Sequence, residues 1–318
     1  MRNTYNQLRI LFILFFAIGC SFVAYSQGEN TTTPTPEVKA EESVTAEQPL
    51  AETVKVKPKL KATKAFTSIW LIDNQTTTVP VKGTFEFDIM HRFGPARNGY
   101  KDFFGFFAAS NISLRFSYVP VENLMMGFAI TKANMTWEFF AKYAIIKQTK
   151  GVKWKFCSLT YYGNMAVETR KKEFYVHGTD RLSFFHQLIL ARRFHERFAA
   201  QVAPSWTHVN VVDGYFSEPG VVSPTRKHDH FAISLGCSIM LKKNMNLIIN
   251  YDQPLTKHKT GNPNPNLSFG LEFATSGHAF QIFAGQYYSI TPQRNNYFNT
   301  NGWKYYLIGF NVTKLWNF

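Results

Sequence analysis

The chain has 318 residues, a formal net charge of +14 and an aromatic content of 16%, including 31 phenylalanines. Beyond the N-terminal segment no apolar run reaches the roughly 18–20 residues that a membrane-spanning helix needs, which excludes a helical membrane protein. The positive charge is spread over predicted loops and the N-terminal region, without a helix or an aromatic-basic motif to organise it, so no nucleic-acid partner is expected.

The N-terminus has the features of an export signal. Two arginines flank the start of an apolar core at residues 10–23, and Ala24 and Ser26 supply the small residues that a signal peptidase requires. The sequence therefore predicts a cleaved signal peptide, residues 1–26. Cys20 raises the alternative of a lipid anchor, but the residues before it form a poor lipobox and those after it stay apolar.

Residues 27–64 differ in composition from the rest of the chain. They are rich in Thr, Pro, Glu, Lys and Ala, contain no aromatic residue and show no periodicity, so a disordered periplasmic linker is expected. The folded domain is then residues 65–318. Its first segment, AFTSIWLIDNQTTTVP at 65–80, precedes the first regular strand and can be at most a small plug folded into the interior.

Alternation of apolar and polar residues marks twelve candidate strands. In the clearest, residues 111–118, Ile112 and Leu114 alternate with Ser113 and Arg115. Strands with one apolar and one polar face predict an all-β fold: a transmembrane antiparallel up-and-down β-barrel of about twelve strands. The predicted strands are residues 84–92, 111–118, 124–131, 136–146, 154–167, 182–193, 197–210, 231–241, 245–252, 266–274, 279–286 and 303–318.

The predicted connections alternate in length. The short ones are 120–123, 147–153, 194–196, 242–244 and 275–278; the long ones are 93–110, 168–181, 211–230, 253–265 and 287–302, and only 132–135 departs from the rule. Outer-membrane barrels have short periplasmic turns and longer outer loops. In a soluble β-sandwich nothing requires short and long connections to alternate along the chain.

The last predicted strand ends on an aromatic residue. Phe310, Val312, Trp316 and Phe318 share its apolar face, and this pattern resembles the C-terminal signature of Gram-negative outer-membrane β-barrels. The resemblance implies that these four side chains are an assembly signal for the barrel-insertion machinery.

A second resemblance begins in the first strand. His91, Arg92, Phe93 and Gly94 form an HRFG motif, followed by the stretches FFGFFAASNISLRFSYVP and WEFFAKYAIIKQTKG. In this order they resemble an uncharacterised family of bacterial outer-membrane β-barrel proteins, a domain of unknown function, over about residues 66–318. The resemblance implies the barrel fold and an outer-membrane location, and it brings no known substrate, cofactor or catalytic residue.

The polar faces of the strands predict the residues of the barrel interior. Arg92 shares this phase with Glu86 and Asp88 and is expected to close an ion-pair network with them, while Gly94 and Pro95 would let the chain leave for the long loop. The predicted lumen network is Glu86, Asp88, Arg92, Arg115, Glu138, Lys142, Asp252 and Glu272. Such a set suits a water-filled pore and also a closed interior in which the charges pair, and this choice stays open.

No catalytic or metal site is predicted. The sequence lacks the histidine–serine spacing of outer-membrane lipid hydrolases and the G-x-S-x-G and H-E-x-x-H motifs, so no enzyme is expected. His228 and His230, with His208 nearby, lack a convincing third ligand, so no metal or cofactor is expected.

Two functions are compatible with these features. The first is a porin-like passive channel or transporter for a small solute whose identity the sequence does not reveal. The alternative is a closed structural or binding barrel that contacts lipopolysaccharide or a partner through basic outer loops. In both cases the expected surroundings are outer-membrane lipid and lipopolysaccharide.

Overall fold

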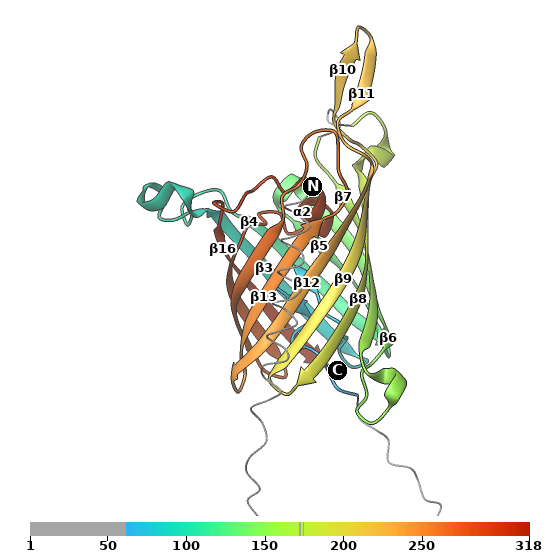
Figure 1. The fold of residues 1–318 in the computed structure, drawn as a ribbon, viewed down its shortest axis with the longest axis vertical. Helices are drawn as coiled ribbons and strands as arrows, with labels where there is room; N and C mark the ends of the chain where they lie inside the picture. Colours follow the sequence, from blue (N-terminus) through green and yellow to red (C-terminus); the bar gives the residue numbers. More distant parts are fainter. Residues whose placement is uncertain (1–61, 172, 174) are drawn as a thin grey trace, which may run out of the picture. The chain divides into compact units, whose positions relative to one another are not determined.

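The structure, a computed structural model, describes residues 62–171, 173 and 175–318. The predicted signal peptide and nearly all of the predicted linker lie outside these residues. Twelve strands form one closed antiparallel barrel, in which β16 pairs with β3 to complete the ring (Figure 1). The wall consists of β3 (Thr84–Pro95), β4 (Asn111–Val121), β5 (Leu124–Thr131), β6 (Thr136–Ile146), β7 (Ser158–Glu168), β8 (Leu182–His195), β9 (Phe198–Val209), β12 (Asp229–Lys242), β13 (Met245–Pro254), β14 (Asn266–Ala274), β15 (His278–Gly285) and β16 (Leu307–Asn317).

The remaining elements are short. Two hairpins, β1–β2 and β10–β11, form separate two-stranded sheets that do not join the sheet of the wall, and the helices are each a few residues long. Among the described residues no helix is long and apolar enough to cross a membrane. These elements are β1 (Trp70–Leu71), β2 (Asn74–Gln75), β10 (Gly214–Glu218), β11 (Val221–Pro224), η1 (Ala96–Asp102), η2 (Ala133–Met135), η3 (Lys153–Lys155), η5 (Gly178–Arg181) and α2 (Pro292–Phe298).

The predicted twelve-stranded barrel is confirmed, with differences at the strand ends. The strand predicted from Trp154 begins at Ser158, because η3 occupies the preceding residues. The strand predicted from Trp303 begins at Leu307, because a turn, in which the amide of Tyr305 donates to the carbonyl of Gly302, comes first. The β10–β11 hairpin lies in a predicted loop and was not predicted.

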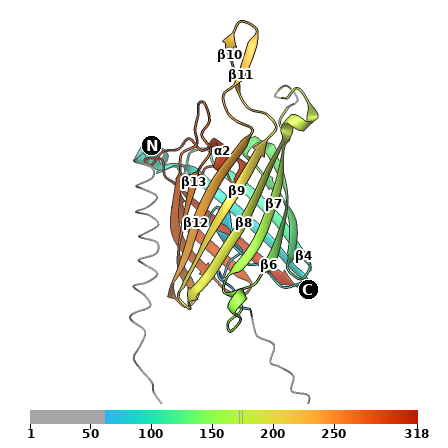
Figure 2. The same ribbon diagram turned by 45° about the vertical axis from the view of Figure 1, so that its right-hand side comes forward.

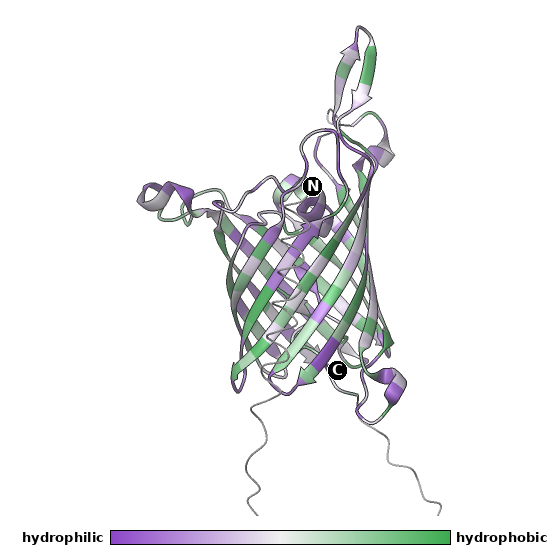
Figure 3. Cartoon of the chain, viewed as in Figure 1, coloured by the Kyte–Doolittle hydropathy of each residue, from purple (hydrophilic) through white to green (hydrophobic). Residues whose placement is uncertain are grey.

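Burial follows the alternation of the strands. On β4 the inward Asn111, Ser113 and Arg115 are at most 1% exposed, whereas the outward Ile112 and Leu114 are only partly covered. Figure 3 shows apolar and polar positions alternating along the wall. Inward polar residues that are this inaccessible indicate that the lumen at this level is filled rather than open.

The two ends of the barrel differ in their connections. Short connections and the C-terminus lie at one end, called the turn end, and the longer loops with β10–β11 lie at the other, called the loop end (Figures 1 and 2). Barrels of the outer membrane place short turns in the periplasm and long loops outside. The turn end is therefore taken as periplasmic.

Candidate functional site

The barrel interior holds the segment that precedes β3. Residues 65–80, called the plug segment, are all buried except Thr67 and include the β1–β2 hairpin. Its polar and apolar groups contact strands all around the wall. The structure therefore contains the inward-folded plug that the sequence allowed for this segment.

Both ends of the plug segment emerge at the turn end. The amide of Thr63 donates to the carbonyl of Gln148 at 2.7 Å, in the β6–β7 connection. The amide of Gly83 donates to the carbonyl of Val119 at 2.9 Å, beside the β4–β5 turn. The plug segment thus enters and leaves the lumen through the same opening.

Apolar contacts fix the body of the plug segment. Ile69, Trp70 and Val79 belong to one buried cluster with wall residues, and Leu71 and Ile72 belong to a second. Ile72 has φ of 58°, a left-handed conformation that a β-branched residue rarely adopts. Such a conformation costs about 1–3 kcal/mol and persists only when the surroundings hold it, so the hairpin tip is held by its contacts with the wall.

The tip of the hairpin carries a buried ion pair with the wall. The guanidinium of Arg92 lies 3.0 Å from the Asp73 carboxylate, and both side chains are at most 2% exposed. The Ser268 hydroxyl donates to the other Asp73 oxygen at 3.2 Å, and Arg92 also donates to the Asn311 side-chain oxygen at 2.9 Å. The tip is therefore attached to β3, β14 and β16 together.

The next two plug residues are bound through their amides. Asn74 donates to Asp252 at 2.7 Å and accepts from Gln187 at 3.1 Å. The Gln75 side-chain oxygen accepts from the Lys142 ammonium at 2.7 Å. These contacts join the hairpin to β13, β8 and β6, three further strands of the wall.

Wall amides also bind the plug backbone. Gln281 donates to the carbonyl of Trp70 at 2.8 Å, Asn311 to that of Ile72 at 2.9 Å, and Gln201 to that of Gln75 at 3.0 Å. A segment with so little secondary structure of its own needs such partners, because buried carbonyls without hydrogen bonds are costly.

The other predicted lumen residues lie beside the plug segment. Asp88 accepts from the indole of Trp70 at 3.2 Å, and the Arg115 guanidinium lies 4.9 Å from the centre of the same ring. Arg115 also donates to both oxygens of Glu138, at 3.1 and 3.3 Å. Two further predicted lumen residues form their hydrogen bonds, within the described residues, with side chains of the wall. Glu86 accepts from Ser117, and Glu272 accepts from Asn246.

Helix α2 covers the lumen from the loop end. It belongs to the β15–β16 connection, and most of its side chains are buried. Gln293 donates to Asn164 of β7 at 2.7 Å, and Arg294 forms a short ion pair with Glu168. The Tyr297 hydroxyl donates to the carbonyl of Lys227 at 2.7 Å. The polypeptide therefore fills the barrel from both ends.

One residue links the two fillings. The Glu138 carboxylate binds Arg115, which packs on Trp70 of the plug segment, and accepts from Thr291, directly before α2, at 3.3 Å. Its side chain is fully buried. A change at Glu138 should therefore affect the contacts of both fillings.

The HRFG residues lie in positions that correct two expectations. Within the described residues, the ion pair of Arg92 is with Asp73 of the plug segment, not with Glu86 or Asp88. Asp88, the nearer of the two, lies four residues away on the same strand, about 13 Å along it, whereas the hairpin tip brings Asp73 into contact. The strand also continues beyond its predicted end at Arg92 to Pro95, and the amide of Gly94 donates to the carbonyl of Gly105 at 3.0 Å, in the loop folded back on it.

The outward residues of the motif stack with the terminal strand. His91 lies 5.0 Å from the ring centre of Phe310 and 4.4 Å from that of Phe93. Trp316 contacts Phe85, 5.7 Å away, while Val312 is half-buried on the same outward face. Phe318 follows the end of β16 and is 88% exposed. The role of Phe310, Val312, Trp316 and Phe318 as an assembly signal stays a prediction.

The histidines at the loop end have different partners. His208 contacts Asp229 at 2.8 Å, and His230 contacts His258, which the sequence did not single out, at 2.9 Å. In the part of the chain that the structure describes, no three metal-ligating side chains gather at one point.

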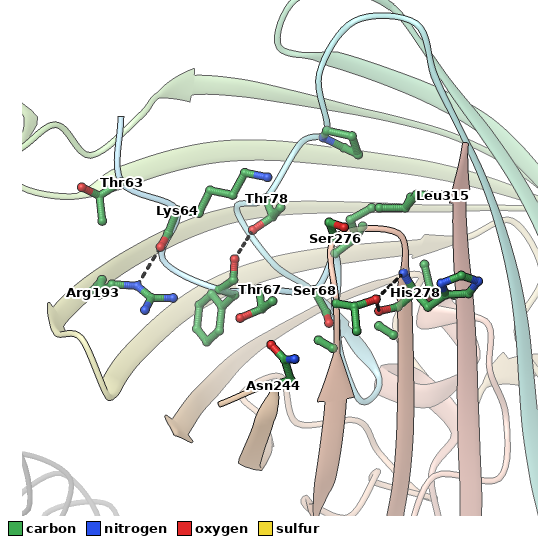
Figure 4. Close-up of a pocket in the computed structure, with 17 residues that line it drawn as sticks. Thr63, Lys64, Thr67, Ser68, Thr78, Arg193, Asn244, Ser276, His278 and Leu315 are labelled. Carbon is green, nitrogen blue, oxygen red and sulfur yellow. Dashed lines mark hydrogen bonds between the residues drawn. The ribbon is translucent and has the colours of Figure 1, made fainter. Parts of the chain in front are cut away.

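A cavity of about 490 Å³ lies at the turn end, between the plug segment and the wall (Figure 4). Lys64 and Arg193 lie on one side of it and His278 on the other. Ser68, which also lines it, is 7% exposed as a residue, and its buried hydroxyl has no hydrogen-bond partner in the described protein. Its other hydroxyl-bearing lining residues are Thr63, Thr67, Thr78, Thr275, Ser276 and Thr313.

Comparison with known proteins identifies the family. The membrane bound beta barrel domain (DUF5777), a domain of unknown function, matches residues 66–316, and the chain belongs to this family. The match confirms the resemblance seen around the HRFG motif, although it does not test the motif itself. A membrane-bound β-barrel of this architecture is an outer-membrane protein, as the sequence predicted.

Solved structures show only a distant likeness. The NanC porin has 8% identity and a TM-score of 0.44, with 74% of this chain and 99% of that chain covered. An outer-membrane channel from Pseudomonas putida F1 has 10% identity and a TM-score of 0.46, with 75% of this chain and 97% of that chain covered. The KdgM porin has 9% identity and a TM-score of 0.38, with 74% of this chain and 99% of that chain covered. No curated protein matches the sequence. Likenesses this weak carry no argument about function.

Proposed function

We propose that this outer-membrane barrel is a gated channel for a small polar solute, closed by the plug segment and by helix α2, and opened when the plug segment withdraws and the less tightly held α2 moves aside. The supporting observation is the charged wall around the plug, where Arg92, Lys142 and Asp252 bind plug side chains. A permanently closed barrel would need no such charges, because apolar side chains in place of buried ion pairs are often as stable or more so. Charged groups, in contrast, become solvated when water replaces the plug.

The cavity at the turn end favours an anionic solute. Lys64 and Arg193 supply positive charge, and no Asp or Glu occurs among the described residues that line it. The buried Ser68 hydroxyl is free to donate to a bound oxygen. An oxyanion, a carboxylate or a phosphate, would give the Ser68 hydroxyl a partner and would form charge-assisted contacts with Lys64 and with Arg193, whose guanidinium also donates to the carbonyls of Lys64, Ala65 and Glu196. The proposed solute class is therefore a small oxyanion.

Electrical recording in planar bilayers tests the proposal. The full-length protein should be mostly silent, and a variant without residues 66–79 should give stable current steps. In a potassium chloride gradient the reversal potential of this variant should indicate anion selectivity. Replacing Arg193 with Gln should reduce that selectivity, whereas Lys259→Gln, at an exposed lysine of the loop end, should not.

The outcomes separate the parts of the proposal. A plug-deleted barrel that is folded, as shown by its heat-modifiable mobility on gels, yet silent both with and without α2 (residues 292–298) would contradict the channel. Current with cation selectivity would contradict only the solute class.

The second candidate is a closed binding barrel. The filling of the lumen from both ends favours it, as does the β10–β11 hairpin, which exposes Phe216 and Val222 away from the wall. In this case the loop end would bind lipopolysaccharide or a partner protein. Silence of every plug variant, together with loss of binding on hairpin deletion, would select this function. Neither candidate involves catalysis.

A further inference from the structure

The loop between β3 and β4 carries an exposed aromatic cluster. Its rings pack on each other, with centroids 5.0 to 6.3 Å apart, yet large fractions stay exposed, 85% for Tyr100 and 82% for Phe107. Contiguous exposed apolar surface in an ordered region marks a contact site. The cluster, called the aromatic ledge, consists of Tyr100, Phe103, Phe104, Phe106 and Phe107.

The loop is built to hold these rings outward. The Asp102 carboxylate accepts from the Asn98 side chain at 2.8 Å and from the Gly105 amide at 3.0 Å. Gly105 has φ of 90° and lies so close to Gly94 that an added Cβ would be 2.1 Å from its carbonyl oxygen. Only glycine meets both requirements. The paired glycines therefore fasten the ledge to the end of β3.

The ledge continues the outward face of the barrel without a break. Phe106 lies 4.4 Å from Phe93, which lies 4.4 Å from His91, which stacks on Phe310 at 5.0 Å. His91, Phe93 and Phe310 belong to the outward faces of β3 and β16, which contact lipid in a membrane-bound barrel. A single aromatic surface thus runs from the lipid-facing wall onto the loop.

The direction of the loop matches this surface. In Figures 1 and 2 the segment with η1 extends sideways at the level of the barrel rim, whereas β10–β11 rises away from the barrel. A loop that extends sideways from a membrane barrel at its rim meets the surrounding leaflet rather than the medium. Aromatic side chains prefer this boundary, where the rings contact acyl chains and polar groups face the headgroups.

We infer that the aromatic ledge lies in the outer leaflet as a lateral lipid-binding foot, with its rings at the boundary between headgroups and acyl chains. The exposed Lys101, beside the rings, can reach lipid phosphates. The HRFG motif then serves two surfaces: Arg92 binds the plug segment inside, while His91 and Phe93 carry lipid contact outward to the ledge. The inference holds whether or not the barrel conducts.

Site-specific photocrosslinking in intact cells tests the inference. A benzophenone amino acid at Phe107 should form adducts with lipopolysaccharide or phospholipid. The same group at Phe216, which is 76% exposed on the β10–β11 hairpin, is the matched control and should form few lipid adducts. Adducts of the Phe107 variant mainly with another protein or a second copy of the chain, or equal lipid adducts at both positions, would overturn the inference.

Fluorescence quenching gives an independent measurement. The purified variants Phe107→Trp and Phe216→Trp are inserted into vesicles that contain brominated phospholipid. The additional emission of the Phe107→Trp variant, relative to the unmodified protein, should be strongly quenched, while that of Phe216→Trp should not. Absence of quenching at position 107 in a heat-modifiable, folded barrel would exclude membrane insertion of the ledge.

Discussion

The plug segment and helix α2 both fill the lumen, but they are held in different ways. The plug segment combines apolar clusters, carbonyls bound by wall amides and a fully buried ion pair, Asp73–Arg92. Helix α2 is held by polar side chains, and its ion pair, Arg294–Glu168, is partly exposed, at 27% and 14%. Water and salt reach the second kind of contact more easily. The loop end should therefore open at lower cost than the turn end.

The largest effect is expected where the two fillings meet. Replacing Glu138 with Gln removes the direct ion-pair partner of the buried Arg115, and removing one partner of a buried pair costs about 3–5 kcal/mol. Hydrogen–deuterium exchange should therefore accelerate in peptides from both the plug segment and the 287–302 connection. Acceleration in only one of the two regions would show that Glu138 does not link them.

A selective effect on the plug is expected from Asp73→Asn. This change leaves Arg92 without its charge partner, which again costs about 3–5 kcal/mol of stability. The cost is partly offset, because Ser268 and Asn311 can still form hydrogen bonds with residue 73 and Arg92. Exchange in residues 65–80 should rise at least tenfold while the α2 region keeps its protection. Channel openings in bilayers should become more frequent. Unchanged exchange in the plug segment would show that the Asp73–Arg92 ion pair does not anchor it.

A smaller effect is expected from Arg294→Gln. Because its ion pair with Glu168 is partly exposed, the loss should be about 1 kcal/mol, and it should shrink at high salt. Faster exchange confined to residues 287–302 would fit this expectation. A variant with Arg97→Gln, which removes an arginine at the same end that stacks on Tyr305 instead, serves as the control.

The smallest effect is a pH dependence at the loop end. His258 packs against Tyr297 of α2 at 5.0 Å between ring centres, beside His230, and burial together with Arg226 and Lys227 lowers the pKa of His258 below its ordinary value of 6.5. The folded loop therefore prefers the neutral ring. Its contribution is complete above pH 6.5 and is lost as the pH falls below that value.

Exchange near α2 should accordingly be faster at pH 5 than at pH 7.5, after correction for the intrinsic pH dependence of exchange. In a variant in which both His230 and His258 are replaced with Gln this difference should largely disappear, whereas His258→Gln alone should reduce it, because burial also lowers the pKa of His230, to about 4. The plug segment, which has no histidine, serves as the internal reference. A larger pH effect in the plug than at α2 would contradict the assignment to His258.

The wall of the barrel was readable from the sequence because each strand repeats one physical pattern. Period-two alternation placed Glu86, Arg115 and Glu138 on the inward faces, where the structure also has them. Their partners were not readable. Asp73 belongs to a segment without alternation, so nothing in its local sequence indicates which strand it meets.

Helix α2 and the aromatic ledge were missed for related reasons. Seven residues of helix within a long loop produce no amphipathic period, and their stability comes from wall contacts such as Gln293 with Asn164. The ledge had a visible signal, because Gly94 and Gly105 each follow a phenylalanine within the predicted loop 93–110. Without the fold, however, that pairing reads equally well as a turn signal.

The shared exit of the plug segment has a consequence for how the molecule is assembled. Because the chain enters and leaves the lumen beside Gln148 and Val119, at one end, it forms a loop inside the ring and is not threaded through it. The strands can therefore close first and receive the hairpin afterwards, or close around it, and reach the same topology. A force on the chain that precedes the plug segment would therefore extract the hairpin without breaking the wall or the plug. When the force is released, the hairpin would return.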